Sequence, residues 1–577
     1  MPQRRRSRSP GRLIALLLLL SLTYVAMAGR LVVLQVVEGP AYARLAADQR
    51  ERVIEFAARR GAILDRDGQA LAVSVDMKTI YADPYFVENP RRTAAKLAPA
   101  LGDHAGELAA RLSEKARYVY LARQIPAEAA DRVEAMDLPG IYTETEPKRF
   151  YPGGKLASHV TGFVDVDGKG LAGVELQYQQ VLEGRPGRMT IEQDPQGRPL
   201  PQADSSYQEP RQGRELFLTI DKELQYFTER ALAEAAQTYG AGGGSAVVMR
   251  PSSGEILAMA NVPDFDPNDA GAYAESAHRN RAITDLYEPG SAFKAITVSA
   301  ALDAGAVTPR QKFIVPASWP YAGEVFNDSH VHPTESMRVT DIITESSNVG
   351  TIKIGLEFDD GVFRRYVRDF GFGSPTGLDF PAEQPGMVPD AEGWTGATEA
   401  TVPIGQGIAV TPMQMASAYS TIANDGVWVE PKLLLSTVDS AGRTSSSPPA
   451  TRRVISKDAT GKATKMLTRV VDEGTGVGAQ VHGYDVAGKT GTAQKPLPTG
   501  GYGNSYVGSF AGFAPARDPQ IAVVVMLDEP TPIWGGLTAA PTFGTIAEFA
   551  LSHLRIAPTR SATGNNLQPP PDLSIRD

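Results

Sequence analysis

Three short motifs follow one another along this chain, and they constrain its fold more than any other feature. They are Ser291-Ala-Phe-Lys294, Ser346-Ser-Asn348 and Lys489-Thr-Gly-Thr492, and each occurs once. Taken alone, each motif is weak evidence of a functional site. A Ser-x-x-Lys pair on a helix, for example, is usually a pair of surface side chains. Their order and their local settings are far more specific, and together they predict one site built from distant parts of the chain.

The first motif has the setting of a nucleophile and its base. A Pro-Gly pair interrupts the chain just before an apolar stretch of good helix formers over residues 292–302. Residues three apart share a helix face, so Ser291 and Lys294 should point the same way, and the free N–H groups of the first turn favour an oxyanion. A serine hydroxyl needs a base. Lysine serves as one only where burial or a nearby cation, such as Lys489, keeps it neutral.

The second and third motifs predict the rest of the site. Ser346 to Asn348 ends a helical stretch over residues 339–345, and Lys489 to Thr492 continues a run that can form a strand. Such a strand can line one side of a cleft, where Gly491 would allow another backbone to come close. The sequence therefore predicts a cleft between a helix start, a helix end and a strand.

The motifs and their flanks resemble the penicillin-binding protein and serine β-lactamase superfamily. They are most similar to class B penicillin-binding proteins, the monofunctional peptidoglycan transpeptidases, and the similarity extends from about residue 13 to about residue 555. The similar segments are 287–294 and 487–494 around the first and third motifs, 405–412 between the second and third, and 60–68, 149–153 and 170–175 upstream.

This resemblance implies an α+β pedestal followed by an α/β transpeptidase domain of the penicillin-binding/serine β-lactamase-like type. That domain would have a central antiparallel sheet flanked by helices and an all-helical subdomain. We expect a cytoplasmic basic tail at 1–12, a transmembrane anchor at 13–37, the non-catalytic (dimerisation-type) pedestal at 38–213, the transpeptidase domain at 214–556 and a disordered tail at 557–577. Local patterns predict helices over 94–110, 127–136 and 222–238, and strands over 62–64, 79–81, 215–220, 245–249, 255–260, 509–514 and 521–527.

The resemblance also implies how the site would work. Ser291 would attack the carbonyl of the penultimate D-alanine of a stem peptide, while Lys294 takes the proton. Ser346 would relay a proton to the leaving D-alanine, and Asn348 would hold Lys294 and the donor peptide's amide. An amine of a neighbouring stem would then attack the acyl-enzyme and crosslink the wall. β-Lactams would acylate the same serine.

The resemblance also implies that the third motif binds the substrate. Lys489 would supply positive potential, and the hydroxyls of Thr490 and Thr492 would bind the terminal carboxylate beside Gly491. The backbone N–H groups of Ser291 and Thr492 would form the oxyanion hole. No cofactor or metal is expected. His330 and His332 have strand spacing without a third ligand, which favours a pair of loop side chains over a metal site.

The N-terminus predicts the compartment. An arginine cluster precedes the apolar segment 13–37, which is long enough to cross a membrane if Arg30 snorkels or is paired. The cluster should stay in the cytoplasm, so the remainder would lie outside. The alternative is a cleaved signal peptide, since Ala26-Met-Ala28 has the small-x-small form. The resemblance favours an anchor and implies contact of Arg30 and Gln35 with a polytopic (FtsW-like) glycan polymerase.

Composition excludes several classes of protein. The net charge is 57 − 66 = −9, so nothing in the charge supports nucleic-acid binding. The chain has no cysteine, which excludes disulfides, thiolate catalysis and cysteine metal sites. No Gly-x-Ser-x-Gly elbow is present, which disfavours an α/β-hydrolase.

Several alternatives share the three motifs. A serine β-lactamase would be a much shorter chain without a pedestal, a bifunctional class A protein would carry a glycosyltransferase after the anchor, and a β-lactam sensor would need several spans and a cytoplasmic effector. A D,D-carboxypeptidase and an inactive division scaffold stay open, although the intact motifs argue against the scaffold. The form of residues 170–175, the moderate pedestal and the short tail resemble the division (FtsI-like) type, at the septum with other division proteins. The elongation type is its alternative.

Overall fold

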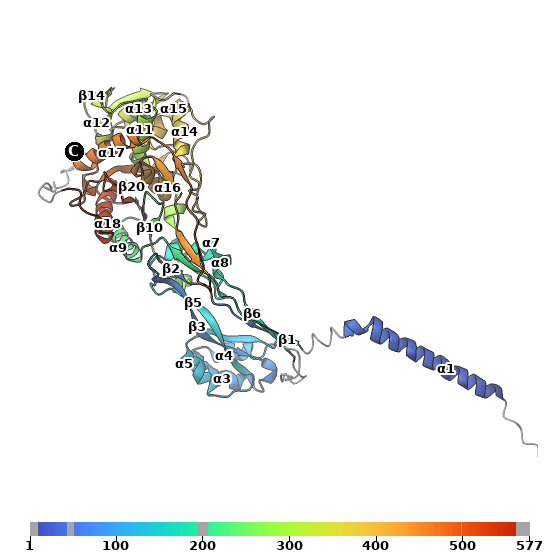
Figure 1. Cartoon of the computed structure of the whole chain (residues 1–577). Helices are drawn as coiled ribbons and strands as arrows, with labels where there is room; N and C mark the ends of the chain where they lie inside the picture. Colours follow the sequence, from blue (N-terminus) through green and yellow to red (C-terminus); the bar gives the residue numbers. More distant parts are fainter. Residues whose placement is uncertain (1–9, 43–50, 193–205, 360, 498, 561–577) are drawn as a thin grey trace, which may run out of the picture. The chain divides into compact units, whose positions relative to one another are not determined.

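The computed structural model describes residues 10–42, 51–192, 206–359, 361–497 and 499–560 (Figure 1). They form two compact units. The first comprises the described parts of residues 1–58 and 185–211, and the second comprises those of residues 59–184 and 212–577. Each unit is described by itself below.

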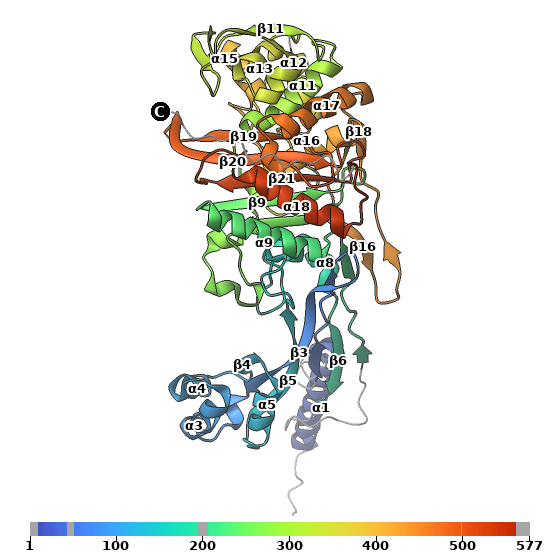
Figure 2. The same cartoon turned by 90° about the vertical axis from the view of Figure 1, so that its left-hand side faces the viewer.

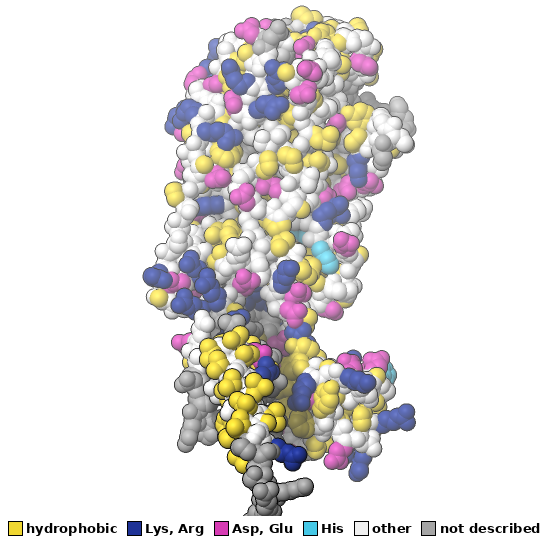
Figure 3. Space-filling view, turned by 90° about the vertical axis from the view of Figure 1, so that its right-hand side faces the viewer, with side chains coloured by type: hydrophobic (Ala, Val, Ile, Leu, Met, Phe, Trp, Pro, Cys, Tyr) yellow, Lys and Arg dark blue, Asp and Glu magenta, His cyan; other side chains and the backbone are white. Residues whose placement is uncertain are grey.

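The first unit contains the apolar N-terminal helix. Helix α1 (Pro10–Val32) continues without a break as a π-helical turn, η1 (Val33–Val37). Most of its side chains are exposed and apolar, and they form much of the yellow surface in the lower part of Figure 3. Residues 11–37 have the length and mean hydropathy, 2.1, of a membrane span, and no other helix in the described ranges does. The unit also holds an antiparallel sheet in the order β1-β6-β7. Its strands are β1 (Glu51–Phe56), β6 (Gly187–Glu192) and β7 (Ser206–Gln208).

The second unit begins with the predicted pedestal. Its sheet has the order β17-β16-β8-β2-β3-β4, and β5 pairs along β3. The strands are β2 (Ile63–Leu64), β3 (Ala70–Ala82), β4 (Val119–Ile125), β5 (Ile141–Phe150), β8 (Glu215–Leu218), β16 (Leu434–Val438) and β17 (Thr444–Ser445). Helices α3 (Pro90–Leu101), α4 (Ala105–Arg111) and α5 (Ala127–Glu134) pack on one end, around Ile80 and Leu97.

The predicted single helix over 94–110 is wrong, because two helices occupy it. Gly102 ends α3 in the left-handed conformation, at φ 68°, and α4 starts after His104. A glycine that adopts positive φ at little cost is a common helix terminator. The predicted strand 79–81 lies near the C-terminal end of the 13-residue strand β3.

The predicted catalytic sheet is confirmed. It is antiparallel throughout, in the order β10-β9-β21-β20-β19. Its strands are β9 (Gly243–Met249), β10 (Ile256–Val262), β19 (Ala487–Pro496), β20 (Tyr502–Ala514) and β21 (Ile521–Asp528). Helices α9 (Lys222–Thr238) and α18 (Ala539–His553) lie side by side over one face (Figure 2). Val523 and Val525 point into that core, while Val524 and Met526 point into the core on the other face.

That other face carries the helical subdomain. Its helices are α11 (Lys294–Asp303), α12 (Val339–Glu345), α13 (Asn348–Gly355), α14 (Val362–Asp369), α15 (Gly396–Thr401), α16 (Pro412–Ala423) and α17 (Lys457–Glu473). Two strand pairs add to the predicted helices: β11 (Lys312–Val315) with β14 (Glu335–Arg338), and β12 (Ser318–Tyr321) with β13 (Glu324–Asn327).

Shorter elements connect these parts. They are η2 (Pro84–Phe86), α6 (Ser158–Thr161), α7 (Gly173–Gln177), α8 (Gln179–Leu182), η3 (Pro267–Ala272), η4 (Glu275–His278), α10 (Arg281–Thr284), η5 (Gly290–Phe293), η6 (Val402–Ile404), β15 (Val427–Val429), β18 (Thr451–Arg453) and η7 (Val477–Ala479). The start of the expected tail, 557–577, is packed on the second unit, since the amide of Thr559 donates to Gly483 and Arg560 pairs with Asp472 at 2.8 Å. Residues 561–577 lie outside the described ranges.

The three upstream motifs converge on one buried ion cluster. Glu175 accepts from Arg60 Nε at 2.5 Å and from Arg149 Nε at 2.6 Å, and none of the three side chains is more than 6 % exposed. Arg149 also donates to the carbonyl of Gly61 at 2.8 Å. A carboxylate between two guanidinium groups compensates charges that would otherwise be costly to bury. The cluster therefore links three segments that are far apart in sequence.

Candidate active site

Ser291 lies in a tight turn that precedes helix α11. The 3₁₀ turn η5 (Gly290–Phe293) comes first, so the prediction that Ser291 begins the α-helix is wrong by one turn. Gly290 has φ 51°, and its amide donates to the carbonyl of Gly405 at 3.0 Å. The Tyr419 hydroxyl donates to the carbonyl of Ala292 at 2.7 Å. These contacts fix the backbone on both sides of the half-buried Ser291.

Gly405 explains why the motif 405–412 accompanies the nucleophile. A Cβ on Gly405 would lie 2.2 Å from the carbonyl oxygen of Gly290, and its φ is 77°. Only glycine fits so close to another backbone in this conformation. The turn that carries Ser291 is thus held by residues 405–412, a segment that follows the second motif in sequence.

Lys294 is completely buried and is held by the second motif. Its Nζ donates to the carbonyl of Ser346 at 2.6 Å and to Asn348 Oδ1 at 2.7 Å, and Ser346 Oγ lies 3.4 Å away. Burial lowers the pKa of Lys294 to about 7, although the negative charge of Asp328 opposes this effect. An amine with this pKa is partly neutral near neutral pH, as a general base must be.

The second motif is placed by a sharp break between two helices. Helix α12 ends at Glu345, and Ser346, which caps it, has φ 64°, an uncommon value for a residue with a side chain. Ser347 then caps α13, and its hydroxyl accepts from the amide of Gly350 at 2.9 Å. The break turns both Ser346 and Asn348 toward Lys294. The sequence predicted the end of α12 at Glu345 and did not predict α13.

The third motif lies on β19, the edge strand of the catalytic sheet. Lys489 is completely buried, and its Nζ donates to Ser346 Oγ at 2.9 Å, to Thr490 Oγ1 at 3.1 Å and to the carbonyl of Thr490 at 3.2 Å. Burial lowers the pKa of Lys489 well below its usual range, and the charge of Lys294 lowers it further. Both lysine side chains lie near the Ser346 hydroxyl, so a positive charge on one of them makes a positive charge on the other less favourable.

The edge of β19 lies against the nucleophile turn. A Cβ on Gly491 would be 2.8 Å from the carbonyl oxygen of Pro289, and one on Gly290 would be 3.2 Å from that of Thr492. Thr492 is half-buried and accepts from the amide of Gly535 at 3.0 Å. An edge strand leaves alternate N–H and C=O groups unpaired. Those groups on β19 point to the side on which Ser291 lies.

The structure thus brings all eight predicted site residues to one place. Hydrogen bonds join Lys294, Ser346, Asn348, Lys489 and Thr490. Gly491 and Thr492 lie against the backbone of Pro289 and Gly290, in the turn that carries Ser291. The hydroxyl of Ser291 has no hydrogen-bond partner among the described residues.

Sequence reasoning missed several supporting residues, since they belong to no motif. Thr475 contacts Thr490 through hydroxyl groups 2.9 Å apart. Glu288 accepts from the amide of Gly407 at 2.9 Å and from the Tyr502 hydroxyl at 3.0 Å, so it joins the nucleophile turn to β20. Only the position of Glu288 beside Ser291 could have drawn attention to it.

The paired histidines have local partners. His330 Nδ1 lies 2.9 Å from the hydroxyl of Ser329, and His332 Nε2 lies 3.0 Å from Asp328 Oδ2. Within the described ranges, no three or more His, Asp or Glu side chains form a group that could hold a metal ion.

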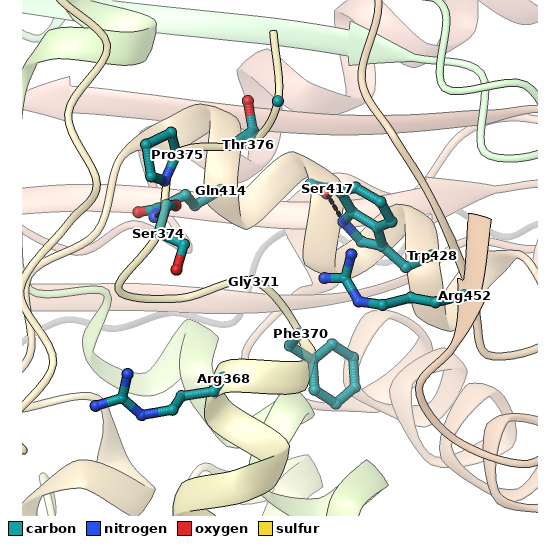
Figure 4. A pocket seen from close by; sticks show the side chains of 11 residues that line it. Arg368, Phe370, Gly371, Ser374, Pro375, Thr376, Gln414, Ser417, Trp428 and Arg452 are labelled. Atoms are coloured by element: carbon teal, nitrogen blue, oxygen red, sulfur yellow. Dashed lines mark hydrogen bonds between the residues drawn. The ribbon is translucent and has the colours of Figure 1, made fainter. Parts of the chain in front are cut away.

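A separate cavity lies between the end of α14 and helix α16 (Figure 4). The indole of Trp428 donates to the Ser417 hydroxyl at 2.9 Å, and the guanidinium of Arg452 stacks on the indole, 3.6 Å from its centre. None of the residues of the three motifs lines this cavity, so it is distinct from the site around Ser291.

A serine on a tight turn, a buried lysine one turn later and a second serine between two lysines define a class of enzyme. It is the class of active-site serine acyltransferases that use lysine in place of histidine.

Comparison with known proteins gives the family. Residues 244–548 match the penicillin binding protein transpeptidase domain, and residues 55–218 match the penicillin-binding protein dimerisation domain. The chain is 35 % identical to the probable peptidoglycan D,D-transpeptidase PbpC of Pseudomonas aeruginosa, over 98 % of each chain. It is also 35 % identical to the peptidoglycan D,D-transpeptidase FtsI of Escherichia coli, over 95 % of this chain and 92 % of that protein.

A solved structure agrees with these sequence matches. The crystal structure of penicillin-binding protein 3 from Mycobacterium tuberculosis in complex with aztreonam has a TM-score of 0.70 and 30 % identity, over 88 % of this chain and 98 % of that one. The chain belongs to the class B penicillin-binding proteins. It is a serine-type peptidoglycan D,D-transpeptidase with one N-terminal helix able to cross a membrane.

Proposed function

We propose that this enzyme crosslinks septal peptidoglycan during cell division, by two acyl transfers through Ser291. The observation that carries the mechanism is the hydrogen-bonded group of Lys294, Ser346, Asn348 and Lys489 beside the nucleophile turn. It offers a base, a proton relay and a positive charge within one cleft, which are the components that acyl transfer needs.

Hydrogen bonding indicates which lysine is the base. Lys294 has two short acceptors, the carbonyl of Ser346 and Asn348 Oδ1, which use two N–H groups and leave a lone pair on a neutral amine. Lys489 has at least three oxygen acceptors, which suit the three N–H groups of an ammonium. These hydrogen bonds favour Lys294 as the neutral partner and Lys489 as the cation, although burial and the charge of Lys294 both lower the pKa of Lys489.

In the first transfer, Lys294 takes the proton of Ser291, and Oγ attacks the carbonyl carbon of the penultimate D-alanine. The oxyanion is held by the backbone N–H groups of Ser291 and Thr492, and losing one such donor typically costs ~10²–10³ in rate. Ser346 passes its proton to the departing nitrogen and is reprotonated by Lys294, so that D-alanine leaves as a neutral amine and Lys294 is neutral again. The Ser291 ester remains.

The donor peptide is aligned by β19 and the second motif. Asn348 Nδ2 donates one N–H to the carbonyl of Asn327 at 2.8 Å, which leaves its second N–H for the carbonyl of a peptide amide. The Thr490 hydroxyl faces Lys489 and Thr475, so it orients the lysine. The half-buried Thr492 hydroxyl is the better placed of the two to meet the terminal carboxylate directly.

In the second transfer, an amine from a neighbouring stem peptide attacks the ester carbonyl. Its proton returns through Ser346 and Lys294 to Ser291 Oγ, and the new amide is the crosslink. A β-lactam ring presents a carbonyl of the same kind, so it acylates Ser291 and blocks the site. The aztreonam complex of the mycobacterial structure supports this assignment by likeness.

The apolar N-terminal helix and the similarity to known proteins support a proposal for the place of this enzyme in the cell. The helix of residues 11–37 anchors the protein in the cell membrane, with residues 38–213 as pedestal and 214–556 as transpeptidase domain outside the cytoplasm. An FtsW-like polymerase and other division proteins are the expected partners. The similarity to FtsI of Escherichia coli supports the division type. Depletion of the protein should produce filaments, whereas rod-shape defects without filaments would indicate the elongation type.

The enzymatic proposal is tested by covalent labelling. We expect the purified full-length protein to bind a fluorescent penicillin with one label per chain, and Ser291→Ala to bind none. Ser299→Ala is the matched control, because Ser299 lies on the same helix and its hydroxyl only bonds to the carbonyl of Ala295. Labelling that survives Ser291→Ala would refute the nucleophile assignment. Release of D-alanine only in the presence of an acceptor amine separates transfer from hydrolysis.

A further inference from the structure

A buried carboxylate lies behind the second motif. The Asp328 side chain is 6 % exposed and follows strand β13. It accepts from the hydroxyl of Ser347 at 2.7 Å, the amide of Val349 at 2.9 Å and His332 Nε2 at 3.0 Å. Two of these donors belong to the first turn of α13, the turn that carries Asn348. Asp328 therefore holds the segment that positions Lys294.

Asp328 is connected to Lys294 by contact and by charge. Lys294 donates to Asn348 Oδ1 at 2.7 Å, and the amide group of Asn348 donates to the carbonyl of Asn327, the neighbour of Asp328, at 2.8 Å. The negative charge of Asp328 raises the pKa of Lys294 against the larger, opposite effect of burial. The carboxylate thus strengthens the hold of Lys294 on its proton.

His332 provides a charge of the opposite sign to Asp328. Its Nε2 faces the carboxylate, and its Nδ1 lies 2.7 Å from the carbonyl oxygen of Pro333. Both of these oxygens can only accept hydrogen bonds, so the imidazolium, which carries hydrogen on both ring nitrogens, fits the two contacts better than either neutral tautomer. The hydrogen bond to Asp328 accordingly raises the pKa of His332.

The other charged groups around the pair come from three elements. Glu335 of β14 raises the pKa of His332, and Glu345 at the end of α12 also interacts with it. Lys489 of β19 is the second cation near Lys294. Of the charged groups named here, Lys294 included, only His332 binds the Asp328 side chain directly.

We propose that Asp328 and His332 are a positioning pair for the reaction at Ser291, in which Asp328 fixes α13 against Lys294 and His332 offsets the negative charge that Asp328 places near that amine. This inference rests on the proposed role of Lys294 as the base. It adds pH-dependent control of that base by a side chain, His332, that does not touch the reacting atoms.

The sign of the effect follows from the two charges. Below its raised pKa, His332 is charged and cancels part of the field of Asp328, so Lys294 loses its proton more easily. As pH rises through the pKa of His332, the imidazolium is lost and Lys294 holds its proton more strongly. Removing the positive charge should therefore move the acid limb of the acylation rate to higher pH, and removing the negative charge should move it to lower pH.

The test measures the second-order rate of acylation of the full-length protein in detergent by a fluorescent penicillin, from about pH 5 to about pH 9. His332→Gln keeps a donor to Asp328 without the charge, and Asp328→Asn keeps the shape. We expect midpoints displaced in opposite directions, by about one pH unit or less. His332→Arg should restore the wild-type midpoint. His330→Gln is the matched control. His330 lies two residues before His332, and its one hydrogen bond among the described residues is with Ser329, so this variant should leave the midpoint unchanged.

Two results would overturn the inference. One is an unchanged midpoint in His332→Gln, and the other is a displacement in the same direction for His332→Gln and Asp328→Asn. A uniform loss of rate without displacement indicates a purely structural role and also contradicts it. If Asp328→Asn does not fold, His332→Gln and His332→Arg decide the question. Failure of the proposed function is distinguishable, because the wild-type protein would then not be labelled at Ser291 at any pH.

Discussion

At the scale of single residues, Gly405 controls the nucleophile through its backbone alone. A methyl group at this position would overlap the carbonyl of Gly290, at 2.2 Å, and positive φ adds strain. We expect Gly405→Ala to displace the Ser291 turn and to lower the acylation rate by about 10²-fold. The measurement is the rate of labelling by a fluorescent penicillin.

Gly305 offers a matched control for this substitution. It also has positive φ, 70°, and it follows helix α11, but a Cβ there would meet nothing within 4 Å. Gly305→Ala should cost about 1–2 kcal/mol in stability and leave the acylation rate unchanged. Equal losses of rate in both variants would show that strain, not the contact with Gly290, is responsible.

The residues that take part in the reaction could be predicted from the sequence, whereas the residues that hold them in position could not. Ser291, Lys294 and Lys489 stand in motifs whose residue types and order fit acyl transfer. Tyr419 and Asp328 reach the site from segments with no such pattern, since each makes its key contact across the fold. Sequence spacing cannot show a hydrogen bond of this kind.

At the scale of secondary-structure elements, the buried cluster around Glu175 joins strand β5, helix α7 and the segment before β2. Glu175→Gln leaves two buried guanidinium groups without a counter-charge and turns an N–H₂ toward one of them. We expect a loss of about 3–5 kcal/mol in the free energy of unfolding, because a broken buried pair leaves charge uncompensated. Thermal or denaturant unfolding of the purified protein measures it.

The exposed pair of Arg59 and Asp76 is the comparison for this cluster. Arg59 Nε donates to Asp76 Oδ1 at 3.1 Å, but the side chains are 59 % and 43 % exposed. Asp76→Asn should cost less than about 1 kcal/mol. A similar cost for the two substitutions would contradict the role assigned to burial.

Elements were predictable where local pattern decides them. The helix over 222–238 and the helix over 339–345 have the predicted bounds, because caps and periodicity lie within each segment. Strands β16 and β17 were missed. Strand β16 pairs with β8 and with β17, so residues 434–438 and 444–445 join a sheet whose other strands precede the catalytic sheet in sequence. That pairing depends on tertiary contact, so no local pattern reveals where the pedestal ends and the catalytic part begins.

At the scale of the whole molecule, the N-terminal helix is consistent with a single-pass membrane anchor. Residues 11–37 form 27 residues of continuous helix across Ala28, and Arg30 pairs with Glu38 at 3.4 Å. At about 1.5 Å per residue this helix exceeds the roughly 30 Å of a bilayer's apolar core. A signal peptide has a shorter apolar region, of about 7–15 residues. An uncleaved anchor therefore fits the helix better than a cleaved signal.

We expect the mature protein to keep its full mass, to stay in the membrane after an alkaline carbonate wash, and to be digested by protease added outside spheroplasts. Ala28→Phe, which would block cleavage after Ala28, should change none of these results. A chain that starts at Gly29 and is released by carbonate, with release prevented by Ala28→Phe, would establish a cleaved signal instead. Because a single anchor with arginines at its cytoplasmic end exports all that follows, the same experiment decides whether Ser291 faces the cell wall.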